Sequence, residues 1–172
     1  MRSAPVGRTT RGRNELAMST AEQTTVEQRL DRIESRTAID RLMADYAFGC
    51  DRQDLGRFMG VFHDDAEYTI PGDFGTSIGS AQIEQTLRAI WEGMPETRHL
   101  ITNVTVDFTG PDTAKGDAHV ICYSRMANGR EGFVYAYYDN RYERRDGVWR
   151  ASSISLEVPW WKLVEFGDML AD

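Results

Sequence analysis

Three side chains in this sequence could together move a proton: Tyr46, Asp51 and His99. A histidine whose ring faces a cavity can serve as a general base, because its pKa lies near neutrality. A carboxylate that accepts from one ring nitrogen fixes the tautomer and makes the other nitrogen more basic. A phenol can hydrogen-bond a substrate oxygen. The three residue types therefore predict proton abstraction inside a pocket.

Each of the three residues also has an ordinary structural interpretation. His99 could be a hydrogen-bonded core histidine, which the residues alone favour over a catalytic one. Asp51 could cap the end of a helix. Tyr46 could be a core residue of an amphipathic helix with its hydroxyl at the surface. Spacing alone does not decide between these interpretations and the catalytic one.

The two other histidines are weaker candidates. His63 follows an apolar stretch and precedes two aspartates, so we expect it in a solvated loop. His119 lies between Ala118 and Val120 in an alternating segment, and we expect its ring to point outward.

A metal centre is not expected in this sequence. Asp51 and His99 are only two ligands, and no third His, Cys or acid has suggestive spacing. Cys50 and Cys122 form neither a metal nor a redox motif, and two cysteines make no disulfide framework. Together these features favour a reducing, cytoplasmic setting.

Composition narrows the class of protein. The chain has 172 residues and a formal charge of −7; residues 1–20 carry four arginines and one glutamate, giving +3 there and −10 in the remainder. The acidic body argues against nucleic acid as the main partner. No stretch is apolar and long enough for a secretory signal or a membrane span. We expect residues 1–22 to form a disordered basic tail, with Met18 a possible initiator, and residues 23–172 to form one domain.

Helices dominate the first half. Apolar residues recur at steps of three and four over 26–49, after Thr24 or Thr25 as a cap, and predict one long helix or two helices with a break near Ser35. A short helix over 54–62, capped by Asp54, and a strand over 66–70 follow. After a turn-rich stretch, Ser80 is expected to cap a helix over 81–94.

Alternating segments fill the second half. They span 97–109, 113–126, 132–145 and 147–158, and the turn signals Gly-Pro-Asp, Asn-Gly and Asp-Gly separate them. The first segment should place His99, Ile101 and Asn103 on one face and its even-numbered apolar residues on the other. The last residues, 158–170, are expected to form a short helix or flap. This order predicts an α+β fold in which helices cover one face of a curved antiparallel sheet and enclose a pocket.

Four stretches carry a resemblance to a known family: "DRIESRTAIDRLMADYAFGCDRQD", "VFHDDAEYTI", "TRHLITN" and "YERRDGVWR". They resemble the SnoaL-like branch of the nuclear transport factor 2-like superfamily, which is similar to scytalone dehydratase, bile-acid 7α-dehydratase and hexachlorocyclohexane dehydrochlorinase. The resemblance implies a cone-shaped α+β barrel, no metal or organic cofactor, and a homodimer or homotrimer. It places an Asp–His catalytic pair on Asp51 and His99, with Tyr46 at a matching position.

The resemblance also implies a pocket wall, made of Tyr68, Ile90, Met94, Val120, Cys122, Ser124, Val134, Ala136, Tyr138 and Ile154. Charged groups that assist the leaving atom in the family fall here on the apolar Ile154 and Val158, and a second cavity histidine falls on Ser124. An anionic leaving group in an apolar pocket needs such help. Loss of water, or proton transfer along an enol, is therefore favoured over loss of halide.

Three functions are open from the sequence. The first is a cofactor-independent lyase of the dehydratase type, or an isomerase, acting on a mid-sized apolar, oxygenated cyclic molecule such as a polyketide or steroid-like ligand. The second is a small-molecule binding protein with the same pocket, and the third is a structural role like that of a dioxygenase β subunit. Trp160 and Trp161 could form a lid or an oligomer contact, and we favour the contact.

Overall fold

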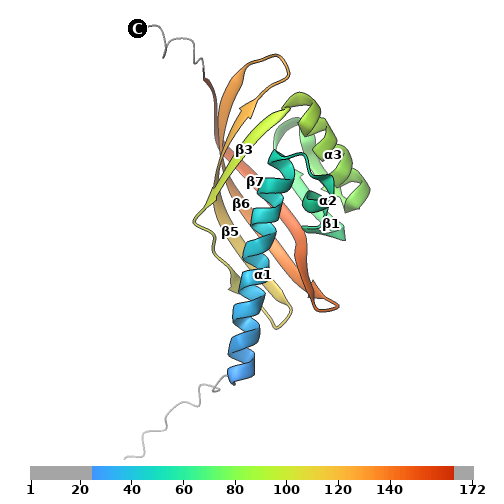
Figure 1. Cartoon of the computed structure of the whole chain (residues 1–172), viewed down its shortest axis with the longest axis vertical. Helices are drawn as coiled ribbons and strands as arrows, with labels where there is room; N and C mark the ends of the chain where they lie inside the picture. The colour runs from blue at the N-terminus through green and yellow to red at the C-terminus, as the bar shows by residue number, and fades with distance from the viewer. Residues whose placement is uncertain (1–24, 165–172) are drawn as a thin grey trace, which may run out of the picture.

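The computed structural model describes residues 25–164, and the predicted basic tail lies outside them. Two longer helices and one short helix lie against one face of a curved seven-stranded sheet (Figure 1). This confirms the predicted α+β cone, although the sheet is open, with β2 (Gly75–Ile78) and β3 (Glu96–Thr102) at its two ends. No helix within residues 25–164 is long and apolar enough to span a membrane.

The helix α1 (Val26–Asp51) is continuous and runs two residues beyond its predicted end. Thr25 and Gln28 form a reciprocal capping box at its start, which satisfies backbone groups that the first turn leaves unpaired. Its first turns reach past the sheet in Figure 1, and Val26, Leu30 and Ile33 are exposed there. From Ser35 onward one side of the helix is buried against the sheet, so the polar residues near its end are held rigidly.

Short elements follow α1. Asp54 caps α2 (Leu55–Met59) by accepting a hydrogen bond from the backbone N–H of Arg57, as predicted. The strand β1 (Phe62–Ile70) pairs antiparallel with β2, which lies in the stretch predicted to be turns. The helix α3 (Gly79–Gly93) begins before Ser80, whose side chain bonds Asp64 instead of capping the helix.

The sheet is a meander with one parallel addition. The strands β5 (Thr113–Arg125), β6 (Glu131–Arg145) and β7 (Val148–Val164) pair with one another in antiparallel order, and β3 and the short β4 (Asp107–Phe108) both pair antiparallel with β5. β1 joins the other side of β7 in parallel, through pairs such as Phe62 with Ala151. The predicted terminal helix or flap is wrong over 158–164, because these residues continue β7.

Among the irregularities of the sheet, two change the predicted faces of residues near the pocket. Asn103 adopts a left-handed conformation, with φ of 53°, and ends β3, so Val104, Val106 and Phe108 turn back toward the core against the predicted alternation. The register of β7 against β6 shifts between Tyr135 and Tyr137, where a bulge carries an extra residue. A one-residue slip exchanges the two faces of a strand.

Candidate active site

Contacts with α2 and α3 fix the end of α1, where its polar residues lie. A side chain at Gly49 would place a Cβ 2.6 Å from the backbone nitrogen of Phe58, so only glycine allows α2 to pack this closely. The indole of Trp91 in α3 donates a hydrogen bond of 2.9 Å to the carbonyl oxygen of Cys50. Two residues after Asp51, Gln53 turns the chain in a left-handed conformation. Asp51 therefore stands on a rigid helix end.

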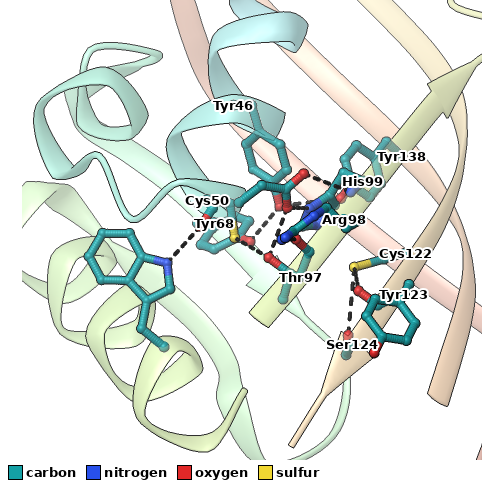
Figure 2. Close-up of polar contacts among 12 residues, drawn as sticks. Tyr46, Cys50, Tyr68, Thr97, Arg98, His99, Cys122, Tyr123, Ser124 and Tyr138 are labelled. Carbon is teal, nitrogen blue, oxygen red and sulfur yellow. Dashed lines mark hydrogen bonds and ion pairs between the residues drawn. The ribbon is translucent and has the colours of Figure 1, made fainter. Parts of the chain in front are cut away.

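Asp51 and His99 are in direct contact. The Oδ1 atom of Asp51 lies 2.5 Å from Nδ1 of His99, and Oδ2 accepts a 2.8 Å hydrogen bond from the backbone N–H of His99. The hydroxyl of Thr97 donates to Oδ1 at 2.8 Å, and Figure 2 shows Thr97 and His99 close together on the same strand. The two side chains are only 12% and 9% exposed. The carboxylate thus orients the ring and leaves Nε2 for the cavity.

The pair is electrostatically coupled. Burial alone would raise the pKa of Asp51 and lower that of His99, since it penalises both charged forms. The contacts reverse both effects: hydrogen bonds from His99 and Thr97 lower the pKa of Asp51. The hydrogen bond to Asp51, helped by the neighbouring Cys122, raises the pKa of His99 to about 10. At neutral pH the pair is therefore a carboxylate and an imidazolium.

A cluster of three phenols faces this pair. The hydroxyl of Tyr46 lies 2.7 Å from that of Tyr68 and accepts a 3.3 Å hydrogen bond from Tyr138. The ring of Tyr46 also meets the ring of His99 edge to face, with centroids 5.9 Å apart. Burial raises the pKa of all three phenols, so they stay neutral hydrogen-bond donors. The hydroxyls supply polarity without charge.

These residues line an apolar cavity of about 580 Å³, within the usual size range for a small-molecule site. Every predicted wall residue lines it except Ile154. Ile154 is fully buried in the core, on the same face of β7 as the cavity residues Leu156 and Val158. Asp51 stands behind His99 and does not line the cavity. The prediction missed several lining residues, namely Cys50, Thr97, Leu156, Val158, Trp161 and the segment Ile70, Pro71, Gly72, Asp73 and Phe74.

The two adjacent tryptophans of β7 have different environments. Trp161 lines the cavity, because the bulge in β7 reverses the alternation beyond Val158. Trp160 lies on the outer face of the sheet beside Ile121, Phe133 and Tyr135. Trp161 is thus a cavity residue, although half of its surface is exposed, as is half of that of Trp160.

A larger groove of about 1020 Å³ lies between the first turns of α1 and the loop after β4. In its lining, Arg144 pairs with Asp31, and the guanidinium of Arg32 lies over the ring of Phe108. The lining contains neither histidine nor cysteine. The candidate functional site is therefore the smaller cavity, where apolar walls surround convergent polar groups.

The other two histidines lie outside the cavity. His63 is buried in β1 and its Nε2 contacts the carbonyl oxygen of Glu143 at 3.0 Å, so the predicted solvated loop is wrong. Pairing of β1 with the sheet buries the start of that strand. His119 points away from the core as predicted and stacks on Tyr135 and Tyr137.

Potential ligand atoms of Cys50, Asp51 and His99 lie within 4.8 Å of one another, which makes them the candidate metal group of the described residues. The donor set fits a cation poorly. Both oxygens of Asp51 already accept hydrogen bonds, and one nitrogen of His99 is engaged by Asp51. Burial raises the pKa of the Cys50 thiol to about 12, whereas a metal ligand must be a thiolate.

A family model for the SnoaL-like domain matches residues 31–155. The chain belongs to the SnoaL-like family, within the nuclear transport factor 2-like superfamily. Hexachlorocyclohexane dehydrochlorinase 1 of Sphingobium indicum is 37% identical over 128 residues, which are 73% of this chain and 82% of the relative. The two proteins are therefore similar in sequence over most of both chains.

Solved structures agree with this assignment. A type 2 hexachlorocyclohexane dehydrochlorinase superposes with a TM-score of 0.75 at 33% identity, covering 80% of this chain and 93% of the other. A protein of Novosphingobium aromaticivorans named for scytalone dehydratase superposes with a TM-score of 0.72, covering 80% and 92%. At 23% identity, the second similarity shows the shared fold alone.

Proposed function

We propose that the protein is a cofactor-independent lyase of the dehydratase type, or an isomerase, that acts on a mid-sized, apolar, oxygenated cyclic molecule. The observation that carries this proposal is the contact between Asp51 and His99, which holds the ring at the wall of an apolar cavity. Relatives that are named dehydrochlorinases, and so catalyse an elimination, support it.

The first step follows from the positions of the three residues. Neutral His99 takes a proton from a carbon beside a carbonyl group, and the carboxylate of Asp51 stabilises the imidazolium that forms. The hydroxyl of Tyr46 donates a hydrogen bond to the oxygen on which negative charge develops. Tyr138 donates to Tyr46 in turn and strengthens its polarity. The product of this step is an enolate.

The second step decides between elimination and isomerisation. If a hydroxyl stands on the next carbon, the imidazolium proton passes to that oxygen, the carbon–oxygen bond breaks and water leaves. If no such group is present, the proton returns to a different carbon of the enolate. Each route restores the neutral ring of His99, so neither needs a further reactant.

The cavity favours water over halide as the leaving group. Neither lysine nor arginine lines the cavity in the described part of the chain, and its other donors are hydroxyls, as in Tyr68, Ser124 and Tyr138. A halide leaves as an anion and needs positive charge beside it. A hydroxyl leaves as neutral water after protonation, which the single imidazolium can supply.

An experiment with cyclic ketones tests the proposal. Incubation in D₂O should place deuterium on the carbon beside the carbonyl group, detected by NMR. β-Hydroxy cyclic ketones should yield the absorbance of an α,β-unsaturated ketone, and faster than chlorinated cyclohexanes lose chloride. Ketones that bind, by calorimetry, but neither exchange nor eliminate at any pH would contradict the proposal.

The raised pKa of His99 favours one alternative, a small-molecule binding protein with no chemistry. An imidazolium cannot accept a proton, so at neutral pH the Asp51–His99 pair could serve only to order the cavity wall. Such a protein would retain ketones without deuterium exchange even at alkaline pH, where the ring is neutral. The exchange measurement across pH therefore separates the two functions.

We also propose that the protein forms a homodimer or homotrimer in the cytoplasm. Leu100, Ile121 and Trp160 are exposed apolar side chains on the outer face of the sheet, opposite the helices. Apolar patches of this kind commonly mark contacts between proteins. Light scattering after gel filtration measures the assembly, and Trp160→Lys should dissociate it.

A further inference from the structure

The two cysteines of the chain both line the cavity, yet they stand in different surroundings. Cys50 lies near the end of α1, and its sulfur is 3.9 Å from the hydroxyl of Thr97. Cys122 lies in β5 and is the direct cross-strand neighbour of His99 in β3. Figure 2 shows Cys122 on the strand beside His99, apart from Cys50. Neither thiol has a part in the elimination described above.

Cys122 completes a line of three groups. Asp51 contacts Nδ1 of His99, and Cys122 is the cross-strand neighbour of His99, with both residues lining the cavity. A thiol next to an imidazole that a carboxylate orients is the arrangement that activates cysteine nucleophiles. The thiol has two hydrogen-bond partners, the carbonyl oxygen of Tyr123 at 3.3 Å and the hydroxyl of Ser124 at 3.7 Å. These contacts keep the sulfur at the cavity wall.

We propose that Cys122 is a nucleophile that forms a covalent thioether with α,β-unsaturated carbonyl compounds bound in the cavity. The thiol gives its proton to water, and the positive charge of His99 stabilises the thiolate. The sulfur forms a bond to the β-carbon as the carbon–carbon π bond breaks. The imidazolium proton of His99 then passes to the α-carbon, and His99 recovers a proton from water. The thiol has added across the double bond, and no oxidant, reductant or further reactant is needed.

The class of electrophile links this site to the proposed elimination. Loss of water from a β-hydroxy ketone yields an α,β-unsaturated ketone, so a product that stays in the cavity would meet Cys122. This link rests on the proposed function. The reactivity of Cys122 does not, because it depends on the placement of the three side chains and can be measured with an added compound.

Cys50 is an internal control for the proposal. Its sulfur lies within 4.8 Å of a ring nitrogen of His99 but also of a carboxylate oxygen of Asp51, and burial, with the Asp51 charge, raises the pKa of its thiol to about 12. It therefore lines the same cavity as Cys122 but should remain a thiol at neutral pH, because the carboxylate beside it offsets the charge of His99. Equal access to a reagent would label both cysteines, whereas a thiolate stabilised by His99 would label only Cys122.

The test is labelling of the full-length protein with 2-cyclohexen-1-one, a small cyclic enone, followed by peptide mass mapping. Rates are divided by those of the urea-unfolded chain, which removes differences due to sequence. Cys122 should react at least about tenfold faster than Cys50 at neutral pH. Equal normalised rates, or faster labelling of Cys50, would overturn the proposal.

Variants identify the cause of the selectivity. His99→Gln keeps a polar side chain of similar length and should abolish the preference for Cys122. Cys50→Ser should leave the labelling of Cys122 unchanged, and circular dichroism verifies that each variant is folded. Persistence of fast labelling in folded His99→Gln would refute activation by the imidazole. Because no turnover is measured, failure of the proposed elimination would leave these outcomes interpretable.

Discussion

The cavity has two polar walls that differ in charge. One wall, where α1 meets β3, carries the Asp51–His99 pair, whose members both change pKa through their contact. The other wall carries the hydroxyls of Tyr46, Tyr68 and Tyr138, which burial keeps neutral. Charge is therefore confined to the pair that can exchange a proton, and the neighbouring phenols only donate hydrogen bonds.

This division separates two tasks. A base needs a partner that stabilises its protonated form, and Asp51 supplies that from behind the ring. An oxygen that gains partial negative charge needs donors that do not lose their own protons, and buried phenols meet that need. The following predictions remove one side or the other, from the largest expected effect to the smallest.

His99→Ala removes the base and should lower kcat by about 10²–10⁴-fold, because general base catalysis contributes that much. Steady-state kinetics on an active ketone measures the loss. His119→Ala is the matched control, since its ring lies on the outer face of the sheet against Tyr135 and Tyr137. Full activity in folded His99→Ala would show that the charged wall takes no part in turnover.

Asp51→Asn removes the charge that holds the imidazolium and should lower activity roughly tenfold to a hundredfold. Activity requires neutral His99, so in the native protein it should rise with pH toward the raised pKa of about 10. Without the carboxylate, burial lowers this pKa, and the rise should move to lower pH by about one to three units. A profile of kcat/KM against pH measures the shift; an unmoved profile would assign the titration to another group.

Tyr46→Phe removes one donor from the neutral wall while two phenols remain. We expect a decrease in kcat of roughly threefold to tenfold, the effect of losing one hydrogen bond. Tyr142→Phe is a suitable control, because the Tyr142 hydroxyl is buried against Asn140 and Met43 away from the cavity. An equal loss in both variants would point to a general effect on the core.

The coupling of Asp51 and His99 should also be visible in stability. The pKa of His99 is raised from 6.5, so its contribution is complete below that pH and is lost as pH rises through the folded value. The pKa of Asp51 is lowered from 3.8, so its contribution is complete above that pH and is lost on acidification.

Calorimetry of Asp51→Asn against the native protein should therefore show its largest deficit, about 1–3 kcal/mol, between pH 3.8 and 6.5. A deficit that is constant across pH would mean that the pair is held by packing and not by charge.

The positions of Asp51 and His99 could be predicted from the sequence because both lie on regular elements. Asp51 ends a helix and His99 lies early in a strand, before any irregularity, and the structure brings the two side chains into contact as expected. Prediction failed after local breaks: Asn103 turns left-handed, and a bulge shifts β7 so that Trp161 faces the cavity. Neither irregularity can be recognised from the periodicity of the sequence. Each one exchanges the faces of the residues that follow it without a change in the pattern of residue types.

The sequence also did not predict how deeply each inward-facing side chain is buried. Ile154 was expected on the cavity wall and does face inward, but it lies deeper in the core than Leu156 and Val158. The burial of His63 likewise depends on pairing between distant strands. Alternation predicts which face of a strand a residue lies on, but not its position along the cone. The burial of these residues could therefore be seen only in the assembled sheet.

The parallel pairing of β1 with β7 has a consequence for how the chain folds. Tyr68 pairs with Ile154, so a wall of the cavity joins segments that are synthesised far apart in time. Contacts between distant segments form slowly, since a long loop must close first. On the ribosome, the first helix and strand must wait for the last strand. Until it arrives, the phenols and the apolar cavity wall stay exposed to other unfolded chains, and this interval is when the protein is most prone to aggregate.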